Sequence, residues 1–354
     1  MSFCWATFVH VEVYNLAHRD IVVIGASLGG VETLPQLVAS LPADFPAAVL
    51  IVQHMAADAP SFLAERLNAA GPLPAGPANT SEPLEPGRIY VAVPDRHLMI
   101  EGDMIRLTHG PRESHARPSI DVLFRSAAYY AGPRVIGIVL TGMLDDGTAG
   151  LWAIKDRGGI AIVQSPDQAP YPAMPRNALR HVKADYILQI EDIPNVLRSL
   201  TREHIEIKER NLNNRLEVET RIALEENALQ KRVRALGAPS FYTCPECHGS
   251  MVVIEEGSIK RFRCHTGHAY SGTALLAQTL PNIEATLWSA LAQAEERQIL
   301  LNELAQRAAS QSEDANGYAE QARRVRVLAE KIRTLTADPT LQKPQSQDQN
   351  ALDG

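Results

Sequence analysis

The sequence has few cysteines and aromatic residues, no excess of positive charge, and no long hydrophobic run. Of its 354 residues only 4 are cysteines and 5% are aromatic, and the formal net charge is -7. An acidic chain lacks the basic excess of nucleic-acid-binding proteins, so we expect no nucleic acid partner. No apolar stretch approaches the roughly 20 residues of a membrane-spanning helix, and the opening residues lack the pattern of a signal peptide. These absences predict a cytoplasmic protein without membrane insertion.

Strands and helices are predicted to alternate over residues 19–200. Four short runs rich in Val and Ile, namely IVVIGA, AAVLIVQH, RVIGIVLTG and GIAIVQS, are typical of strands covered on both faces. The helical segments VETLPQLVASL, SFLAERLNAA and AGLWAIKDRG lie between them. This alternation predicts an α/β fold with a doubly wound, mostly parallel sheet and helices on both faces. Ligands of such folds bind beyond the carboxyl ends of the strands.

The rest of the chain differs from this region in composition. Residues 1–18 are expected to form a disordered leader, in which Cys4 is an idle thiol. A charged stretch free of Gly and Pro, running from Ile205 to Leu236 with apolar residues at helical spacing, predicts a helical linker. We therefore divide the remaining chain into a linker over 201–237, a Cys/His module over 238–273, a helical hairpin over 274–337 and a disordered tail over 338–354.

The first predicted strand runs into the turn ASLGG, which suits either a bound phosphate or a nucleophilic Ser27. A dinucleotide site needs an acidic residue at the end of the second strand, where Gln53 and His54 stand instead. His54 is able to act as the base for Ser27, and Asp145 or Asp146 is able to orient the histidine. The alternatives are that Ser27 is a helix N-cap and that the aspartates are ordinary turn residues.

Five motifs together resemble the catalytic domain of the CheB-type chemotaxis protein-glutamate methylesterases. They are IGASLGG, IVQHM, RPSIDVLFRSAA, VLTGMLDDGTAG and YPAMPRNAL, and they span residues 21–190. The resemblance implies that Ser27 is the nucleophile, His54 the base and Asp146 the carboxylate that orients the histidine. It also implies oxyanion binding by the backbone N–H of Met143, with a second donor in the turn at Leu28. Well-known members carry a threonine at the position of Leu28, and we expect this difference to tune the rate.

The resemblance implies hydrolysis of glutamate γ-methyl esters on the cytoplasmic helices of chemoreceptors, often with deamidation of receptor glutamines. It implies no cofactor for catalysis, and methylated chemoreceptor domains or a related signalling protein as partners. Well-known members also carry an N-terminal receiver domain, whereas only about twenty residues precede the first strand here. We therefore expect any phosphorylation control to come from a separate regulatory protein. The alternative is a non-enzymatic signalling scaffold that acts through its C-terminal region, namely the Cys/His module, for which zinc is expected, and the helical hairpin.

A polar segment, GPRESHARPSIDVLF, precedes one of the predicted helices. The resemblance places Arg112, Glu113, His115 and Arg117 near the mouth of the cleft. A solvated loop that leads to a helix, with Ser119 as its N-cap, is an equally open interpretation. None of these residues is expected to be catalytic.

The Cys/His module has the spacing of a closed tetrahedral zinc site. Cys244 and Cys247 come from one turn, and Cys264 and His268 from a second, with a predicted hairpin between them. His265 and His248 are alternative fourth ligands. A segment with so little apolar content needs a metal to fold, so the expected zinc is structural. The alternative is an unmetallated remnant with buried cysteines.

Overall fold

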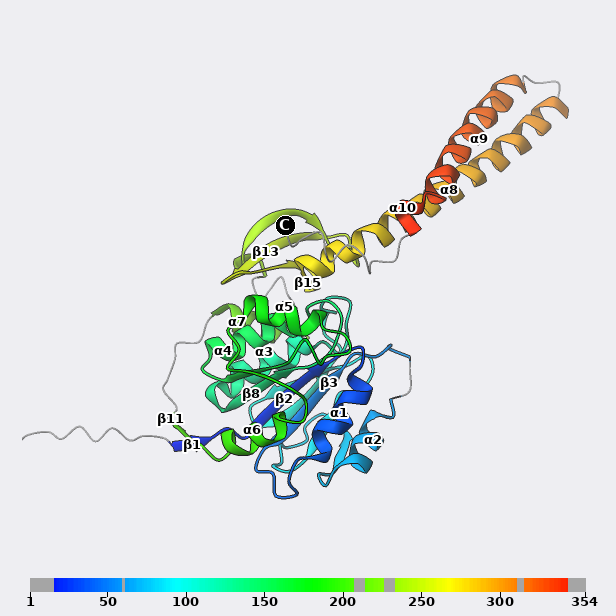
Figure 1. Ribbon diagram of the computed structural model, residues 1–354. Helices are drawn as coiled ribbons and strands as arrows, with labels where there is room; N and C mark the ends of the chain where they lie inside the picture. The colour runs from blue at the N-terminus through cyan, green and yellow to red at the C-terminus, as the bar shows by residue number, and fades with distance from the viewer. Residues whose placement is uncertain (1–15, 59–60, 207–213, 226–232, 311–314, 343–354) are drawn as a thin grey trace, which may run out of the picture. The chain divides into compact units, whose positions relative to one another are not determined.

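The computed structural model describes most of the chain and divides it into two compact units, Met1–Gly272 and Thr273–Gly354. Cys4 and most of the predicted leader lie outside the described residues, as do Leu212 and Leu229 of the predicted linker. The described residues are 16–58, 61–206, 214–225, 233–310 and 315–342 (Figure 1).

The first unit is built on a parallel sheet of seven strands in the order β10-β9-β8-β2-β3-β5-β4. All its neighbouring strands pair in parallel. The four predicted Val- and Ile-rich runs contain β2, β3, β8 and β9, which confirms the predicted fold class. The strands are β2 (Ile21–Ala26), β3 (Ala48–Gln53), β4 (Ala75–Pro77), β5 (Ile89–Val91), β8 (Val135–Val139), β9 (Ile160–Gln164) and β10 (Tyr186–Leu188).

Helices cover both faces of this sheet (Figure 1). Side chains alternate along each strand, so Ile21 and Val23 of β2 pack on one face and Val22 and Ile24 on the other. The second of these faces packs against α1 (Gly30–Ala39), α2 (Leu63–Ala70) and α6 (Ile193–Leu200). The first packs against α3 (Ile120–Tyr130), α4 (Thr148–Asp156) and α5 (Ala173–His181).

Strand β2 lies between β3 and β8, where the strand order changes direction. In open α/β sheets such a switch point leaves a crevice beyond the carboxyl ends of the strands. The three turns that leave β2, β3 and β8 therefore meet at one edge of the sheet, and this edge carries the candidate site.

Short antiparallel pairs flank the main sheet. Strand β1 (Leu16–His18) pairs with β11 (His204–Glu206), and β6 (His97–Glu101) pairs with β7 (Met104–Thr108). The prediction of a disordered leader is therefore wrong for residues 16–18, because the partner strand supplies their hydrogen bonds. A 3₁₀ turn, η1 (Gly132–Arg134), precedes β8.

The predicted linker helix is shorter than its sequence pattern indicates. Ile205 belongs to β11, and within the described residues the linker contains α7 (Asn214–Ala223) and the 3₁₀ turn η2 (Val233–Ala235). Leu216 of α7 packs into the core of the main sheet, and Val233 packs with Val252 of the next module. The linker thus forms part of the first unit.

The Cys/His module is a four-stranded antiparallel sheet in the order β12-β13-β14-β15. The predicted hairpin corresponds to β13 (Ser250–Glu256) and β14 (Ile259–Cys264), and it is widened by β12 (Ala238–Thr243) and β15 (Ala269–Ser271). The outer strands were not expected, because their sequences lack an alternating apolar pattern.

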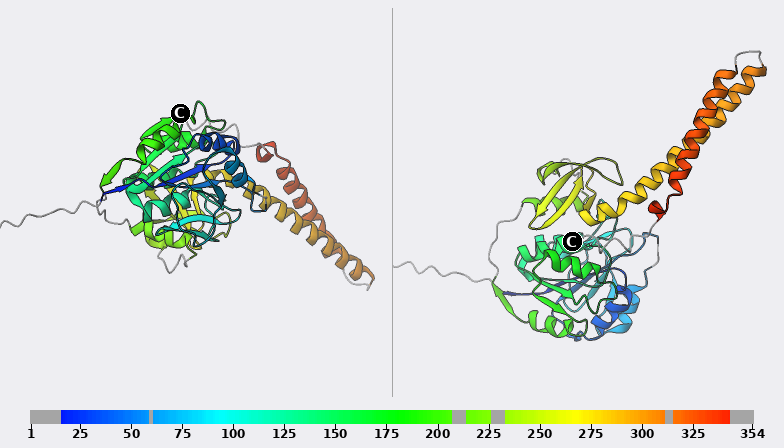
Figure 2. Two further views of the ribbon diagram at one scale, coloured as in Figure 1. Left: turned by 90° about the horizontal axis from the view of Figure 1, so that it is seen from below. Right: turned by 45° about the horizontal axis from the view of Figure 1, so that its top comes forward.

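The second unit is an antiparallel pair of helices, α8 (Gly272–Ser310) and α9 (Asn316–Thr336) (Figure 2). Leu291, Ala294 and Ala329 form the buried seam between them. The predicted hairpin is present, but a further turn of helix, α10 (Pro339–Gln342), occupies the start of the predicted disordered tail. Among the described helices, none combines the length and hydrophobicity that crossing a membrane requires.

Candidate active site

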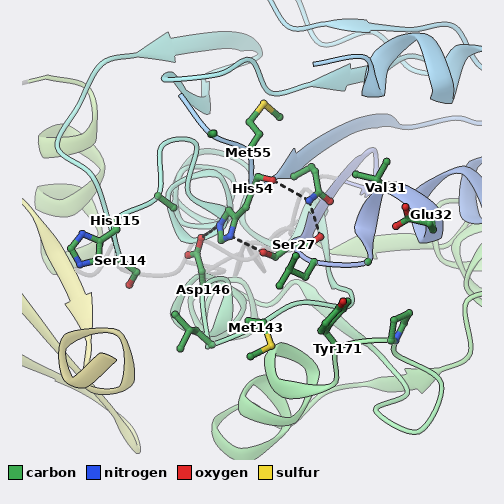
Figure 3. Close-up of a pocket in the computed structure, with 17 residues that line it drawn as sticks. Ser27, Val31, Glu32, His54, Met55, Ser114, His115, Met143, Asp146 and Tyr171 are labelled. Carbon is green, nitrogen blue, oxygen red and sulfur yellow. Dashed lines mark hydrogen bonds and ion pairs between the residues drawn. The ribbon is translucent and has the colours of Figure 1, made fainter. Parts of the chain in front are cut away.

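A cleft of about 950 Å³ opens at the carboxyl edge of the main sheet. Ser27 follows β2, His54 follows β3, and Asp146 lies in the turn between β8 and α4. All three line the cleft together with Leu28 and Met143 (Figure 3). The structure thus brings together the five residues that the sequence analysis assigned to catalysis and to oxyanion binding.

The turn that carries Ser27 is held tightly by its neighbours. Its backbone N–H donates to Thr141 O at 2.9 Å, and its carbonyl accepts from Gln53 Nε2 at 2.7 Å. Glycine fits position 30 without disturbing Gln53, because a Cβ atom there would lie 2.0 Å from Gln53 Oε1. The N-cap of α1 is Gly29. The alternative interpretation of Ser27 as an N-cap is therefore wrong, and its hydroxyl is directed toward His54.

His54 lies between the serine and the aspartate (Figure 3). Its Nδ1 is 3.2 Å from Ser27 Oγ, and its Nε2 is 2.7 Å from Asp146 Oδ2. An ionised carboxylate only accepts hydrogen bonds. Nε2 therefore carries the ring proton when the imidazole is neutral, which leaves the Nδ1 lone pair facing the Ser27 hydroxyl.

Asp146 is buried and receives several hydrogen bonds besides that of His54. The backbone N–H groups of Ile120, Asp121 and Gly147 donate to it at 2.8 to 3.0 Å, and Ser119 Oγ does so at 3.0 Å. Burial raises the pKa of this carboxyl, but the bond from His54 and the backbone donors outweigh burial and lower it. Asp146 is thus held as a carboxylate.

Ser119 and Asp121 contribute to the site in ways that the sequence did not indicate. Ser119 occupies the N-cap position of α3 but makes no capping bond, because its hydroxyl donates to Asp146. Burial, together with the adjacent Asp146 carboxylate, raises the pKa of Asp121 to about 8.

Asp145, the residue before Asp146 in the same turn, points away from His54 and accepts from Ser271 Oγ at 2.7 Å. The turn thus directs its two aspartates to different partners.

Two backbone N–H groups of the cleft have the surroundings of oxyanion donors. In the part of the chain that the structure describes, neither Leu28 N–H nor Met143 N–H donates to a protein acceptor. The turn after Met143 places Leu144 in the left-handed region, with φ of 58°. Asn177 Nδ2 fixes this turn by donating to Leu144 O at 2.7 Å. Asn177 lies in the motif YPAMPRNAL, but no role was predicted for it from the sequence.

The predicted metal ligands also converge. The Sγ atoms of Cys244, Cys247 and Cys264 and a ring nitrogen of His268 all lie within 4.8 Å of one another. Three sulfurs and one imidazole nitrogen are a donor set that suits tetrahedral zinc. His268 Nε2 lies 3.3 Å from Glu246, a carboxylate of the kind that orients metal-bound histidines. The residues present therefore fit the expected ion, and all four positions would be occupied by the protein.

Comparison with known proteins gives consistent matches over the first half of the chain. A family model described as CheB methylesterase matches residues 22–197. A protein-glutamate methylesterase/protein-glutamine glutaminase of Methanosarcina mazei is 38% identical over 192 residues, which are 52% of this chain and 52% of the relative. One from Anaeromyxobacter dehalogenans is 40% identical over 186 residues, or 54% of its length. The chain thus spans about half the length of these curated relatives.

Shorter relatives are matched over nearly their whole length. A relative from Leptospira interrogans, named for the same pair of activities, is 36% identical over 188 residues, which are 53% of this chain and 97% of that protein. Among solved structures, the catalytic domain of Thermotoga maritima CheB methylesterase is 34% identical. The match covers 51% of this chain and 98% of that domain, with a TM-score of 0.49.

Proposed function

The chain belongs to the CheB methylesterase family, and on this premise we propose that it is a protein-glutamate methylesterase with Ser27, His54 and Asp146 as its catalytic triad. The proposal is based on the continuous chain of hydrogen bonds that runs from Ser27 Oγ through the His54 ring to Asp146. A serine hydroxyl is a weak nucleophile unless a base is positioned to take its proton. In this chain of hydrogen bonds His54 is the base, and the carboxylate of Asp146 orients it.

In the first half of the reaction, His54 Nδ1 takes the proton of Ser27 as Oγ attacks the γ-ester carbonyl. The resulting imidazolium is stabilised by Asp146, which remains ionised. The oxyanion is held by the backbone N–H groups of Leu28 and Met143. Such donors stabilise the charge that develops in the transition state and lower the barrier by several kcal/mol, typically about 3 for one donor.

The tetrahedral intermediate collapses when His54 returns the proton to the leaving methoxide, which departs as methanol. Water then attacks the acyl-enzyme with His54 again as the base. The products are a free Ser27 and a glutamate that carries one more negative charge on the substrate. A glutamine side chain presents the same acyl carbon with ammonia as leaving group, so we propose glutaminase activity for the same site.

The proposed substrate is the methylated cytoplasmic domain of a chemoreceptor, or a related signalling protein, which places the proposed reaction in the cytoplasm. These proposals rest on the family and on the names of the relatives. No cofactor is needed for catalysis, because the serine, the imidazole and the carboxylate supply the nucleophile and the proton transfers.

We propose zinc as a structural ion at Cys244, Cys247, Cys264 and His268. When bound, zinc would cross-link the two turns that carry its ligands and so stabilise a sheet with a small apolar core. Elemental analysis of the purified chain tests this proposal, and one zinc ion per chain is expected. Substoichiometric metal after purification without chelators would contradict it.

The function is tested by methanol release from methylated receptor cytoplasmic fragments. Wild type is expected to release methanol, and Ser27→Ala is expected to lower the rate by roughly 10⁶-fold, as loss of a triad serine does elsewhere. Circular dichroism of the variant controls for folding. Methanol release that survives in Ser27→Ala would remove Ser27 from the mechanism, and a folded wild type without activity would favour the scaffold alternative.

A further inference from the structure

One wall of the cleft is a short polar turn, the cleft loop (residues 112–117). Ser114, His115 and Ala116 of this loop line the cleft. Two backbone hydrogen bonds between Glu113 and Ala116 close the turn, at 3.3 and 2.9 Å. Ser114 and His115 both lie in the left-handed region, with φ of 48° and 62°. Two consecutive non-glycine residues in this region are strained, so the loop needs support from outside itself.

The Cys/His module supplies this support through its backbone. Ser114 N–H donates to Ala269 O at 2.7 Å, and Ala269 N–H donates to Arg112 O at 3.3 Å. Ala269 is the first residue of β15. The cleft loop therefore continues the sheet of the module, beyond its last strand.

Buried charges hold the same loop. Glu113 is only 4% exposed, and its carboxylate accepts from Arg263 of β14 at 2.7 Å and from Arg125 of α3 at 2.6 Å. Arg263 also donates to Glu219 of α7 at 2.8 Å. Breaking one partner of a buried pair leaves an uncompensated charge, which is strongly unfavourable. The position of Glu113 is thus tied to the module and to the linker at once.

His115 is held by the module as well. Its ring packs edge-on against the ring of Tyr270, with centroids 4.9 Å apart, and its Nδ1 is 3.5 Å from Glu246. Figure 3 shows His115 directed away from Ser27 and toward the module. Three consecutive loop residues therefore contact the module, each by a different kind of interaction.

The module also contacts the other side of the triad. Ser271 of β15 donates to Asp145, the residue before Asp146. The module contributes no residue to the lining of the cleft itself. Its effect on the cleft must therefore pass through the cleft loop and the turn at Asp145.

We propose that the Cys/His module is the support of the substrate-binding wall, and that Arg263 is the positioning residue through which it sets the affinity for a polypeptide substrate. This inference rests on the proposed esterase function. The cleft loop would contact the protein chain around the modified glutamate, whereas the reacting carbonyl is bound by the turns at Ser27 and Met143. A small ester has no flanking chain, and it would be hydrolysed without contacting the wall.

The test compares Arg263→Met with Arg261→Met. Both arginines are buried on β14 and both donate to Glu219. Arg261 has Glu256 as its second carboxylate partner, whereas Arg263 has Glu113 and also donates to Gly267 O. Two substrates are assayed, a methylated receptor fragment and p-nitrophenyl acetate.

Arg263→Met is expected to raise KM for the fragment at least about fivefold, the lower end of typical coupling between sites. Arg261→Met is expected to leave this KM within about twofold, and both variants are expected to keep wild-type kcat on the small ester.

The outcomes separate the two proposals. A wild type that hydrolyses neither substrate contradicts the proposed function. A wild type that hydrolyses both, with equal KM for the fragment in the two variants, overturns the role of Arg263. Should Arg263→Met fail to fold by circular dichroism, Arg263→Lys replaces it with Arg261→Lys as its control. A lysine keeps the charge but is unable to bond both carboxylates in the arginine geometry, and an unchanged KM in Arg263→Lys overturns the inference in the same way.

Discussion

The single carboxylate of Asp146 has two structural roles. It orients His54, and it accepts the first backbone N–H groups of α3, which have no partner inside their own helix. The negative charge also lies at the positive end of that helix. These donors fix the carboxylate in position, and such pre-organisation is what the proposed catalytic role of Asp146 requires.

The adjacent Asp121 gives a pH dependence of stability. Its pKa is raised to about 8 in the folded state by burial and by Asp146, against an ordinary value of 3.8 for an aspartate in the unfolded chain. Between these pH values the folded chain holds a proton that the unfolded chain has released. The stability from this group is therefore fully present below pH 3.8 and is lost as the pH rises through about 8, with a slope of at most about 1.4 kcal/mol per pH unit.

Asp121→Asn removes this titration and retains the side-chain oxygen that accepts from Gly150 N–H. We expect the variant to become progressively more stable than wild type as the pH is raised from 5 to 9. Thermal unfolding of both proteins across this range measures the difference, in which contributions from other groups largely cancel. A difference in Tm that stays constant with pH would contradict the raised pKa of Asp121.

At the scale of elements, the site depends on how closely three turns approach one another. The turn at Ser27 packs against Gly142, where a Cβ atom would lie 2.8 Å from the Ser27 Cβ. Gln53, at the end of β3, bonds the carbonyl oxygens of both Ser27 and His54, at 2.7 and 3.1 Å. One amide side chain therefore links the turn that carries Ser27 to the turn that carries His54.

Gly30→Ala is expected to disrupt this link. The new Cβ would lie 2.0 Å from Gln53 Oε1, so the amide must move and its bond to Ser27 O must weaken. We expect a loss of roughly 1–3 kcal/mol in the free energy of unfolding and a kcat lowered by about tenfold or more, because small misplacements of reacting groups are costly.

Gly76→Ala is the matched control, since a Cβ atom at Gly76 meets nothing within 4 Å. Urea unfolding and methanol release are measured on both variants. Equal kcat values for Gly30→Ala and Gly76→Ala would show that the contact between Gln53 and the turn has no part in positioning Ser27.

The sequence predicted those elements whose pattern is local. The continuous apolar runs of β2, β3, β8 and β9 were identified, and the residues that converge in the cleft follow three of these strands. Strands of three residues, such as β4 and β5, are too short to show a period. Glu113 was open to interpretation as a solvated residue, and it is buried because Arg263, 150 positions away in the sequence, folds against it.

Long-range contacts likewise decide which aspartate of a pair faces His54. The residues alone left Asp145 and Asp146 as alternatives, and the family resemblance was needed to choose Asp146. In the structure Ser271 faces Asp145, and His54 faces Asp146. Neither partner lies near the aspartates in the sequence, so no local pattern distinguishes the two side chains.

At the scale of the whole molecule, the division into units does not follow the end of the methylesterase match at residue 197. The first unit extends to Gly272 and includes the linker and the Cys/His module. Strand β1 pairs with β11, and Glu219 of the linker is fully buried against Arg261 and Arg263. The part of the chain that folds with Ser27, His54 and Asp146 is therefore longer than the family domain.

This division predicts different results for two truncations. A chain that ends at Gly272 retains every contact of the first unit, so we expect kcat on p-nitrophenyl acetate within about threefold of the full chain, as for a change remote from the reacting groups. A chain that ends at Leu200 loses the partner strand of β1 and leaves Glu113 with only Arg125 of its two arginine partners, and breaking one partner of a buried ion pair costs at most about 3–5 kcal/mol. We expect the shorter chain to unfold at a temperature lower by several degrees, and to bind receptor fragments more weakly if it folds.

Differential scanning calorimetry and fragment KM values for the full chain and both truncations measure these effects. Equal Tm and equal KM for the chains that end at Leu200 and at Gly272 would mean that the module and the linker are dispensable to the catalytic unit, despite their buried contacts with it.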